Sequence, residues 1–329
     1  MSARASLLAN ARAMIPPLLP EFHKGQAGRV GIVGGSRDYT GAPFYVSMAS
    51  MRLGSDMAFT VCAPEAALAI KSYSPDMIVQ PVLDAARDAA DVRAELRTLF
   101  ARLHSVVVGP GLGREPHMQT FAAVAIEVAR ELHLNLVVDA DGLWLVHNRP
   151  EVVHGYRRAV LTPNVVELAR LCKSLHVEEP ESPSALPRLS DALGGVTVLA
   201  KGGTDRIASP AGTAECDEPG SLKRCGGQGD LLSGSLGTMM AWAKRYEERS
   251  ADGPVLGVDG RAHPPLAPER LPLIAAWAAS ALARHVSHAG FMRLGRSMLA
   301  DDLLGDIGPA YENMRPASRA SRGEAAERK

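Results

Sequence analysis

The residue types best suited to chemistry lie in one stretch, Arg224 to Gly234, where a glycine-rich turn ends in an acid and runs into an apolar helical pattern. Amides at a helix N-terminus lack partners within the helix and carry the positive end of its dipole. Those around Gly227 and Gly229 can therefore stabilise charge on a phosphoryl group during transfer. The adjoining Asp230 can take a proton from a substrate hydroxyl. The stretch favours a phosphoryl-transfer site, and a tight turn or helix C-cap is the alternative.

A second polar pair, Asn164 and Glu167, follows an apolar run that ends at Leu161, and Pro163 marks a helix start. A spacing of three residues places both side chains near one face of the first helical turn. A carboxylate there can hold Mg²⁺ through water, and the ion can bridge phosphate oxygens. We therefore predict that Glu167 binds the metal. A capping Asn followed by a first-turn Glu is the structural alternative.

Further polar or glycine positions stand where apolar runs end. Lys201 follows Val196 to Ala200 and could present its ammonium to nucleotide phosphates, although a solvated lysine beside a hairpin is the alternative. Gly111 is the expected glycine of close approach to a substrate, because a side chain there would obstruct the ligand. Asp139 and Asp141 either organise the floor of the site or its metal, or cap helices.

The elements that must position these residues alternate between two patterns. Short apolar runs predict buried strands at 30–33, 58–62, 105–108, 136–138, 159–161 and 196–200. Helical patterns fall at 44–53, 121–132, 165–171, 231–243 and 273–288. This order predicts a mainly parallel α/β sheet with right-handed crossovers and helices on both faces. Such sheets bind ligands at the carboxyl ends of their strands, where most of the polar residues above stand.

Taken together, these motifs resemble a known family. The Gly-x-Gly-Asp sequence at 227–230 resembles the signature of the ribokinase-like superfamily, and its longer form, Lys223 to Gly234, is similar to the ATP-dependent NAD(P)H-hydrate dehydratases. Further stretches match that family's order between about residues 15 and 308. They are Phe22–Ser36, Tyr39–Pro43, Val108–Arg114, Val138–Leu143, Leu161–Glu167 and Lys201–Asp205.

The resemblance implies a role for each matching residue. Asp230 would be catalytic with the amides at Gly227 and Gly229, and Mg²⁺ would bind at Glu167. The hydrated nicotinamide nucleotide would contact Gly111, Asn164, Val165, Val166, Glu167, Leu168, Ala169, Arg170 and Asp230. ATP would contact Lys201, Gly202, Gly203, Thr204, Asp205, Gly220, Ser221, Leu222, Lys223, Arg224, Cys225, Gly226, Gly227, Gln228 and Gly229.

The reaction implied is ATP-dependent dehydration of the S-epimer of hydrated NADH or NADPH, giving back the reduced nucleotide with ADP and phosphate. A ribokinase-like kinase for a small hydroxymethyl heterocycle is the alternative, and a nucleotide-binding protein without catalysis is a third. The glycines at 31–36 do not fit a dinucleotide-binding Rossmann site, because residues 37–41 delay the helix and no acid closes the second strand at 58–62.

Composition sets broader limits. The chain has 329 residues, 46% of them hydrophobic, and a formal net charge of zero, so no global field recruits nucleic acid. No apolar run is long enough to span a membrane, and the ten histidines and four cysteines lack zinc-ligand spacing. We expect small-molecule partners, a possible homo-oligomer, and a location in the cytosol, with mitochondria as the alternative because of weak transit-peptide character at the N-terminus.

The domain plan follows from the same patterns. We expect a flexible arm over 1–14, a single domain over 15–308 and a flexible tail over 309–329. Two Pro-containing stretches, 178–190 and 250–272, are predicted to be a loop and a surface insertion.

Overall fold

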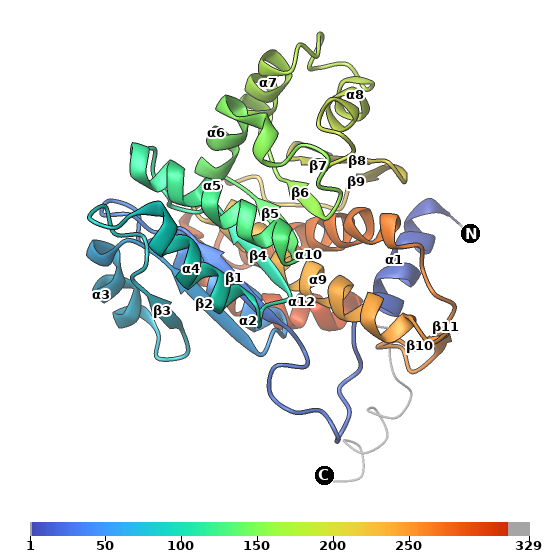
Figure 1. Ribbon diagram of the computed structural model, residues 1–329. Helices are drawn as coiled ribbons and strands as arrows, with labels where there is room; N and C mark the ends of the chain where they lie inside the picture. Colours follow the sequence, from blue (N-terminus) through green and yellow to red (C-terminus); the bar gives the residue numbers. More distant parts are fainter. Residues whose placement is uncertain (1, 315–329) are drawn as a thin grey trace.

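The computed structural model describes residues 2–314, which build a nine-stranded sheet between two layers of helices (Figure 1). The strand order is β3-β2-β1-β4-β5-β6-β7-β8-β9, parallel as far as β7 and antiparallel for β8 and β9. The strands are β1 (Arg29–Val33), β2 (Met57–Val61), β3 (Ile78–Gln80), β4 (Ser105–Val108), β5 (Asn135–Val138), β6 (Ala159–Leu161), β7 (Thr197–Ala200), β8 (Asp205–Ser209) and β9 (Gly212–Cys216). The predicted fold class is confirmed.

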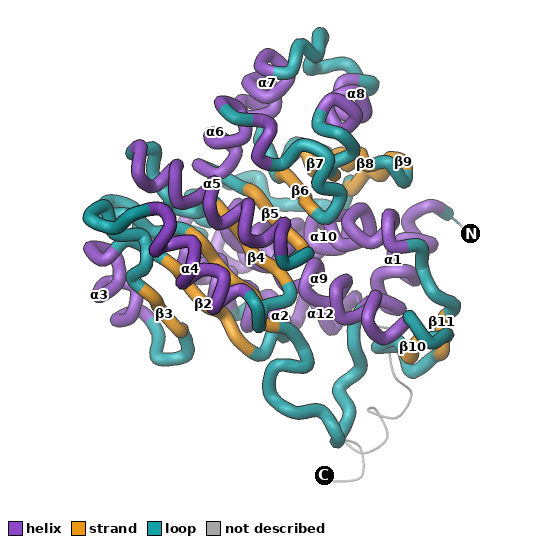
Figure 2. The backbone as a smooth tube through the Cα atoms, viewed as in Figure 1, coloured by secondary structure: helices purple, strands orange, loops and turns teal. Residues whose placement is uncertain are grey.

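Each face of the sheet has its own core, because successive strand side chains point to opposite sides. In β4, Val107 joins one core, while Val106 and Val108 join the other. The first core lies under α1 (Ala3–Met14), α2 (Gly41–Leu53), α3 (Pro64–Tyr73), α9 (Gln228–Ser250), α10 (Leu271–Leu294), α11 (Ala300–Leu304) and α12 (Ile307–Met314). The second lies under α4 (Ala89–Phe100), α5 (Pro116–Glu131), α6 (Asp141–Asn148), α7 (Val165–Ser174) and α8 (Ala185–Ala192). Figure 2 shows the strands between these layers.

The orientation of helix α9 determines where the glycine-rich turn lies. The Ser105 hydroxyl at the start of β4 donates to Gly237 O at 2.7 Å, and the Asn135 amide at the start of β5 donates to Met240 O at 2.8 Å. The other end of β5 meets the first turns of α9, where the Ser233 hydroxyl bonds Asp139. Helix α9 therefore runs against the strand direction, and its N-terminus lies at the carboxyl edge of the sheet.

Close packing against α2 holds α9 in this position. A Cβ at Gly234 would lie 2.3 Å from Val46 O, so only glycine allows the two helices this approach. Almost every side chain from Leu231 to Ala243 is buried, which agrees with the apolar pattern of the sequence.

The ends of the chain are more ordered than their composition predicts. Residues 3–14, expected to be a flexible arm, form α1, in which Ala11 and Met14 are fully buried against the first core. Residues 309–314, expected to begin a flexible tail, belong to α12, where Ala310 and Met314 are buried. The remaining tail, 315–329, lies outside the described residues.

Two internal expectations also need correction. Residues 178–190 were expected to form a loop, yet α8 begins at Ala185 and buries Leu186 and Leu189. Its proline, Pro187, lies in the first turn, where a missing amide costs little. Within the predicted insertion, a short antiparallel hairpin forms from β10 (Val255–Leu256) and β11 (Ala262–His263). Val258 N beside it donates to Arg12 O of α1 at 3.1 Å.

Candidate active site

The glycine-rich turn starts α9 in the manner the sequence predicts for an anion site. Gly227 is the N-cap, with φ +94°, and its missing Cβ would lie 2.4 Å from the Ala300 Cβ. The first helical hydrogen bond runs from Leu231 N to Gly227 O at 3.0 Å. The amides of residues 228–230 precede that bond, so they have no acceptor within the helix. The turn is therefore a helix N-cap rather than a C-cap.

Asp230 occupies the first turn of α9. Burial raises the pKa of its carboxyl to about 7, the negative charge of Asp139 adds to the rise, and Lys201 opposes it. Among the described residues, no donor lies within hydrogen-bond distance of the Asp230 carboxylate. A carboxylate with a pKa near neutrality is a stronger base than an ordinary aspartate, as a proton acceptor for a hydroxyl requires.

Asp139 and Lys201 form the charged floor beside Asp230. The Lys201 Nζ lies 2.9 Å from Asp139 Oδ1, and the two side chains are 22% and 3% exposed. Burial alone would raise the pKa of Asp139, but Lys201 and hydrogen bonds from Ser233 and Thr162 outweigh it and hold that pKa below its ordinary value. Lys201 is thus an ion-paired residue at the end of β7, not the solvated lysine of the alternative. Asp139 is an organiser of the site floor.

Asp141 has a different role. Its Oδ2 accepts from Gly113 N at 3.0 Å, and its Oδ1 pairs with Arg114 Nε at 3.1 Å. These contacts hold the glycine loop after β4. Asp141 is therefore structural.

Asn164 and Glu167 form a capping box at the start of α7. Asn164 Oδ1 accepts from Val166 N and Glu167 N, both at 3.0 Å, while Asn164 N donates to Glu167 Oε2 at 2.8 Å. Burial raises the pKa of Glu167, and Lys201 and the Asn164 amide oppose the rise. The capping alternative thus describes the local geometry. It occupies one oxygen of Glu167, a residue that also lines the cleft described below.

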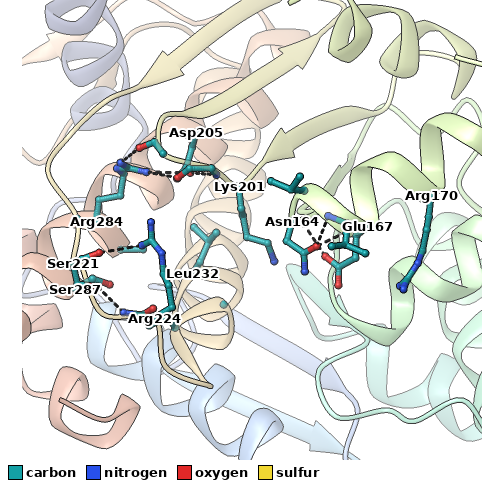
Figure 3. Close-up of a pocket in the computed structure, with 18 residues that line it drawn as sticks. Asn164, Glu167, Arg170, Lys201, Asp205, Ser221, Arg224, Leu232, Arg284 and Ser287 are labelled. Atoms are coloured by element: carbon teal, nitrogen blue, oxygen red, sulfur yellow. Dashed lines mark hydrogen bonds and ion pairs between the residues drawn. The ribbon is translucent and has the colours of Figure 1, made fainter. Parts of the chain in front are cut away.

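These elements surround a cleft of about 640 Å³ (Figure 3). Many predicted site residues line it: Asn164, Val165, Val166, Glu167, Arg170, Lys201, Gly202, Gly203, Asp205, Gly220, Ser221, Arg224, Gln228 and Gly229. Figure 3 shows Lys201 extending toward Asn164 and Glu167. The cleft therefore joins the predicted substrate segment to both predicted nucleotide segments.

Other predicted residues do not line the cleft. They are Gly111, Leu168, Ala169, Thr204, Leu222, Lys223, Cys225, Gly226, Gly227 and Asp230. Leu168 packs into the second core, and Leu222 is 87% exposed. Asp230 follows the lining residue Gly229, whose added Cβ would lie 3.8 Å from Lys201 Nζ. Asp230 is therefore adjacent in sequence to the cleft lining, although it does not line the cleft itself.

Gly111 is a glycine for a reason other than the one predicted. With φ +62°, its added Cβ would lie 2.8 Å from Tyr39 O and 3.1 Å from Pro43 Cδ. Its carbonyl accepts from Gly35 N and from the Ser36 hydroxyl. The close approach at this position is to the protein's own 39–43 loop.

Sequence reasoning missed Leu232 of α9 and the whole contribution of α10 to the cleft. Leu232, Ala283, Arg284 and Ser287 line it. Residues 283–287 lie within the helical pattern predicted for 273–288 and match none of the motifs above, so the sequence did not mark them as site residues. Only the packing of α10 beside β8 and β9 brings them to the nucleotide segments.

The donor set can be tested for Mg²⁺. Within residues 2–314, no group of three or more acidic, His or Cys side chains could hold a metal ion alone. Mg²⁺ usually takes only one or two carboxylates and completes its shell with phosphates and water. The carboxylate of Glu167, which lines the cleft, fits that pattern. Over the same described range, no helix is long and apolar enough to cross a bilayer.

Comparison with known proteins agrees with the expected family. The family model described as NAD(P)H-hydrate dehydratase matches residues 30–304. An ATP-dependent (S)-NAD(P)H-hydrate dehydratase of Mycosarcoma maydis is 50% identical, over 95% of this chain and 89% of the relative.

Solved structures agree on the fold. A ribokinase-like superfamily protein of Enterococcus faecalis superposes with a TM-score of 0.71 at 17% identity, covering 93% of this chain and 94% of the other. An ADP/ATP-dependent NAD(P)H-hydrate dehydratase of Bacillus subtilis, co-crystallised with ATP and Mg²⁺, gives 0.64 at 18% identity over 94% and 97%. With a family model matching most of its length and a glycine-capped helix carrying Asp230, this chain belongs to the NAD(P)H-hydrate dehydratase family.

Proposed function

We propose that the protein is an enzyme that converts the S-epimer of hydrated NADH or NADPH back to the reduced nucleotide, using ATP. The observation that carries this proposal is the position of Asp230, in the first turn of α9 beside the Asp139–Lys201 pair, in a chain 50% identical to a relative with that activity in its name. The names of several relatives favour the dehydratase over the small-molecule kinase.

In the first step, the ring hydroxyl of the hydrate attacks the γ-phosphorus of ATP. Asp230 accepts the hydroxyl proton, and the bond between the γ-phosphorus and the bridging oxygen breaks, releasing ADP. The free amides at the start of α9 and the ammonium of Lys201 stabilise charge on the phosphoryl group. The role of the protein here is positioning and electrostatic stabilisation.

In the second step, the carbon–oxygen bond of the phosphorylated ring breaks and phosphate leaves. The lone pair of the ring nitrogen supplies the electrons that stabilise the cation left behind. Loss of a proton from the adjacent ring carbon then restores the double bond. The sum is hydrate plus ATP giving NADH or NADPH, ADP, phosphate and a proton.

Mg²⁺ would lie beside Glu167 and, when bound, neutralise phosphate charge. The Asn164 side chain keeps the Glu167 backbone in place, and the Asn164 amide fixes one Glu167 oxygen. The Glu167 carboxylate is thus held in one position in the cleft lining.

The decisive measurement follows reduced-nicotinamide absorbance after purified protein is mixed with hydrated NADH, Mg²⁺ and either ATP or ADP. We expect absorbance to recover with ATP, with one ADP formed per NADH. A stable phosphorylated product on small alcohols, without recovery from the hydrate, would instead establish a kinase.

The matched variants are Asp230→Asn and Asp252→Asn, the latter in the exposed loop after α9. Loss of a general base costs about 10²- to 10⁴-fold in rate, so D230N should lose at least about 10²-fold in kcat. D252N should keep the wild-type rate. A D230N enzyme with near-normal turnover would exclude Asp230 as the base.

For the compartment, we propose the cytosol, with mitochondria as the alternative. The support is compositional: all four cysteines are free thiols, and their number is low for a disulfide-stabilised protein. Imaging of the chain tagged at its C-terminus, with a mitochondrial marker, tests the choice.

A further inference from the structure

The side chain of Arg284 forms hydrogen bonds with two segments at the ATP cleft that are far apart in the sequence. It projects from α10, is 14% exposed, and lies between residues 202–205 and Glu218. Figure 3 shows it beside Asp205, at the end of the cleft opposite Arg170.

The bonds on the first side fix the loop after β7. Arg284 Nη1 lies 3.1 Å from Asp205 Oδ1 and donates to Gly202 O at 3.3 Å, while Nη2 donates to Gly203 O. Asp205 is itself held, since its Oδ1 accepts from Gly202 N at 2.9 Å and its Oδ2 accepts from the Ser280 hydroxyl at 2.7 Å. Ser280 and Arg284 are one helical turn apart, so two side chains of α10 form hydrogen bonds with this loop.

The bond on the second side fixes the chain two residues before the other predicted nucleotide segment, 220–229. Arg284 Nε donates to Glu218 O at 2.5 Å. The Glu218 carboxylate, 10% exposed, is paired with Arg4 of α1 and with His285 Nε2 at 3.1 Å. Two residues later, Gly220 lines the cleft.

The guanidinium has little capacity left for a ligand. Its five N–H groups serve four bonds, to Glu218 O, Gly202 O, Asp205 Oδ1 and Gly203 O. Bonds of this kind, made by a charged planar donor to carbonyl and carboxylate acceptors, fix geometry more firmly than a lysine could. Arg284 therefore acts on the protein segments rather than on the phosphates.

From this geometry we infer that Arg284 is a positioning residue for ATP, which sets the separation between the 202–205 loop and the segment that begins at Glu218. The inference rests on the proposed use of ATP. It requires that removal of Arg284 weaken the binding of ATP while the site of the hydrate, built on α7 and Asp230, stays intact.

The test compares Arg284→Lys and Arg284→Met with Arg293→Met, a control on the same helix whose side chain pairs with Asp306 at 2.6 Å outside the cleft lining. We expect the KM for ATP to rise about tenfold in R284M and less in R284K, as loss of charge-assisted hydrogen bonds predicts. The KM for the hydrate and kcat at saturating ATP should change less than about threefold. R293M should leave both KM values unchanged, whatever its effect on Tm.

A double-mutant cycle with Asp205→Asn adds a readout that a general loss of stability would not produce. We expect the two substitutions to be strongly non-additive in the KM for ATP, because both remove the same link. If R284M does not fold, R284K and D205N decide the question. An unchanged ATP KM in folded R284K and D205N, or an equal rise in both KM values, overturns the inference.

Direct titration of ATP with Mg²⁺ by calorimetry separates this inference from the proposed function. Recovery of NADH by the wild type, with equal ATP affinity in wild type and R284K, would remove the role of Arg284 and leave the dehydratase standing. If ATP binding depends on Arg284 but no NADH is recovered, the role of Arg284 would stand and the proposed dehydratase activity would fall.

Discussion

At the scale of single residues, the proposed base Asp230 affects the stability of the fold. Its pKa in the folded protein is about 7, above the ordinary value of 3.8, so folding favours the protonated carboxyl. Ionisation of Asp230 therefore costs stability, and that cost grows as pH rises from about 4 and is complete above about pH 7. The burial that raises the basicity of the carboxylate therefore also lowers the free energy of unfolding when the carboxylate is ionised.

We accordingly predict that Asp230→Asn stabilises the protein at pH 8. The amide cannot ionise, so the variant should gain about 1–3 kcal/mol in the free energy of unfolding at pH 8 after a discount for partial exposure, and less at pH 5. Denaturant unfolding at the two pH values, with Asp252→Asn as the control, measures the difference. A gain that is equal at both pH values would show that ionisation is not its cause.

At the scale of elements, the start of α9 depends on one glycine. Gly227 combines φ +94° with an added-Cβ distance of 2.4 Å from Ala300 Cβ, whereas no atom lies within 4 Å of an added Cβ at the adjoining Gly226. The left-handed conformation and the contact with α11 together fix where the helix begins. They therefore also fix where its free amides point.

Gly227→Ala should thus lower both stability and kcat, while Gly226→Ala serves as the matched control. Backbone strain and overpacking each cost about 1–3 kcal/mol, so G227A should lose at least about 1 kcal/mol and G226A should change little. Denaturant unfolding and kcat measurement check both. Adding Ala300→Gly should recover only the part of the loss that comes from the contact, and full recovery would argue against backbone strain.

At the scale of the whole molecule, α1 joins regions that are far apart in the sequence. Its Arg4 pairs with Glu218, and its Arg12 Nε donates to Met314 O of α12 at 2.7 Å. Arg249 Nη2 of α9 donates to Met14 O at 3.3 Å. Residues 3–14 are therefore part of the helical layer over the first core, not an appendage to it.

Two substitutions near this end distinguish a packed helix from an arm. Met14 is fully buried, whereas Leu18 is 87% exposed. Met14→Ala should cost about 2–5 kcal/mol and Leu18→Ala almost nothing, because only the first leaves a cavity. Thermal unfolding of both variants checks this. Equal Tm values for M14A and the wild type would support the flexible arm.

The sequence by itself determined the parts of this protein that depend on neighbours along the chain. The strands from β1 to β7, except β3, follow from short apolar runs, and the start of α9 follows from a glycine turn joined to an apolar helical pattern. Asn164 and Glu167 belong to the same class, since a capping box involves residues three apart. Local backbone geometry and periodicity encode these features, so they can be read without a fold.

Only the tertiary structure decided which distant charges meet. Lys201 pairs with Asp139 across 62 positions, and Arg284 reaches Gly202 across 82. The antiparallel strands β8 and β9 and helix α1 carry weak local patterns and are stabilised by packing against the rest of the first core. Whether a charged side chain is solvated, paired or used to hold a loop depends on burial and on partners that only folding brings together. For that reason the sequence indicated Asp230 as a candidate base. It did not indicate that Lys201 and Asp139 form an ion pair beside it, nor that Arg284 contacts the 202–205 loop.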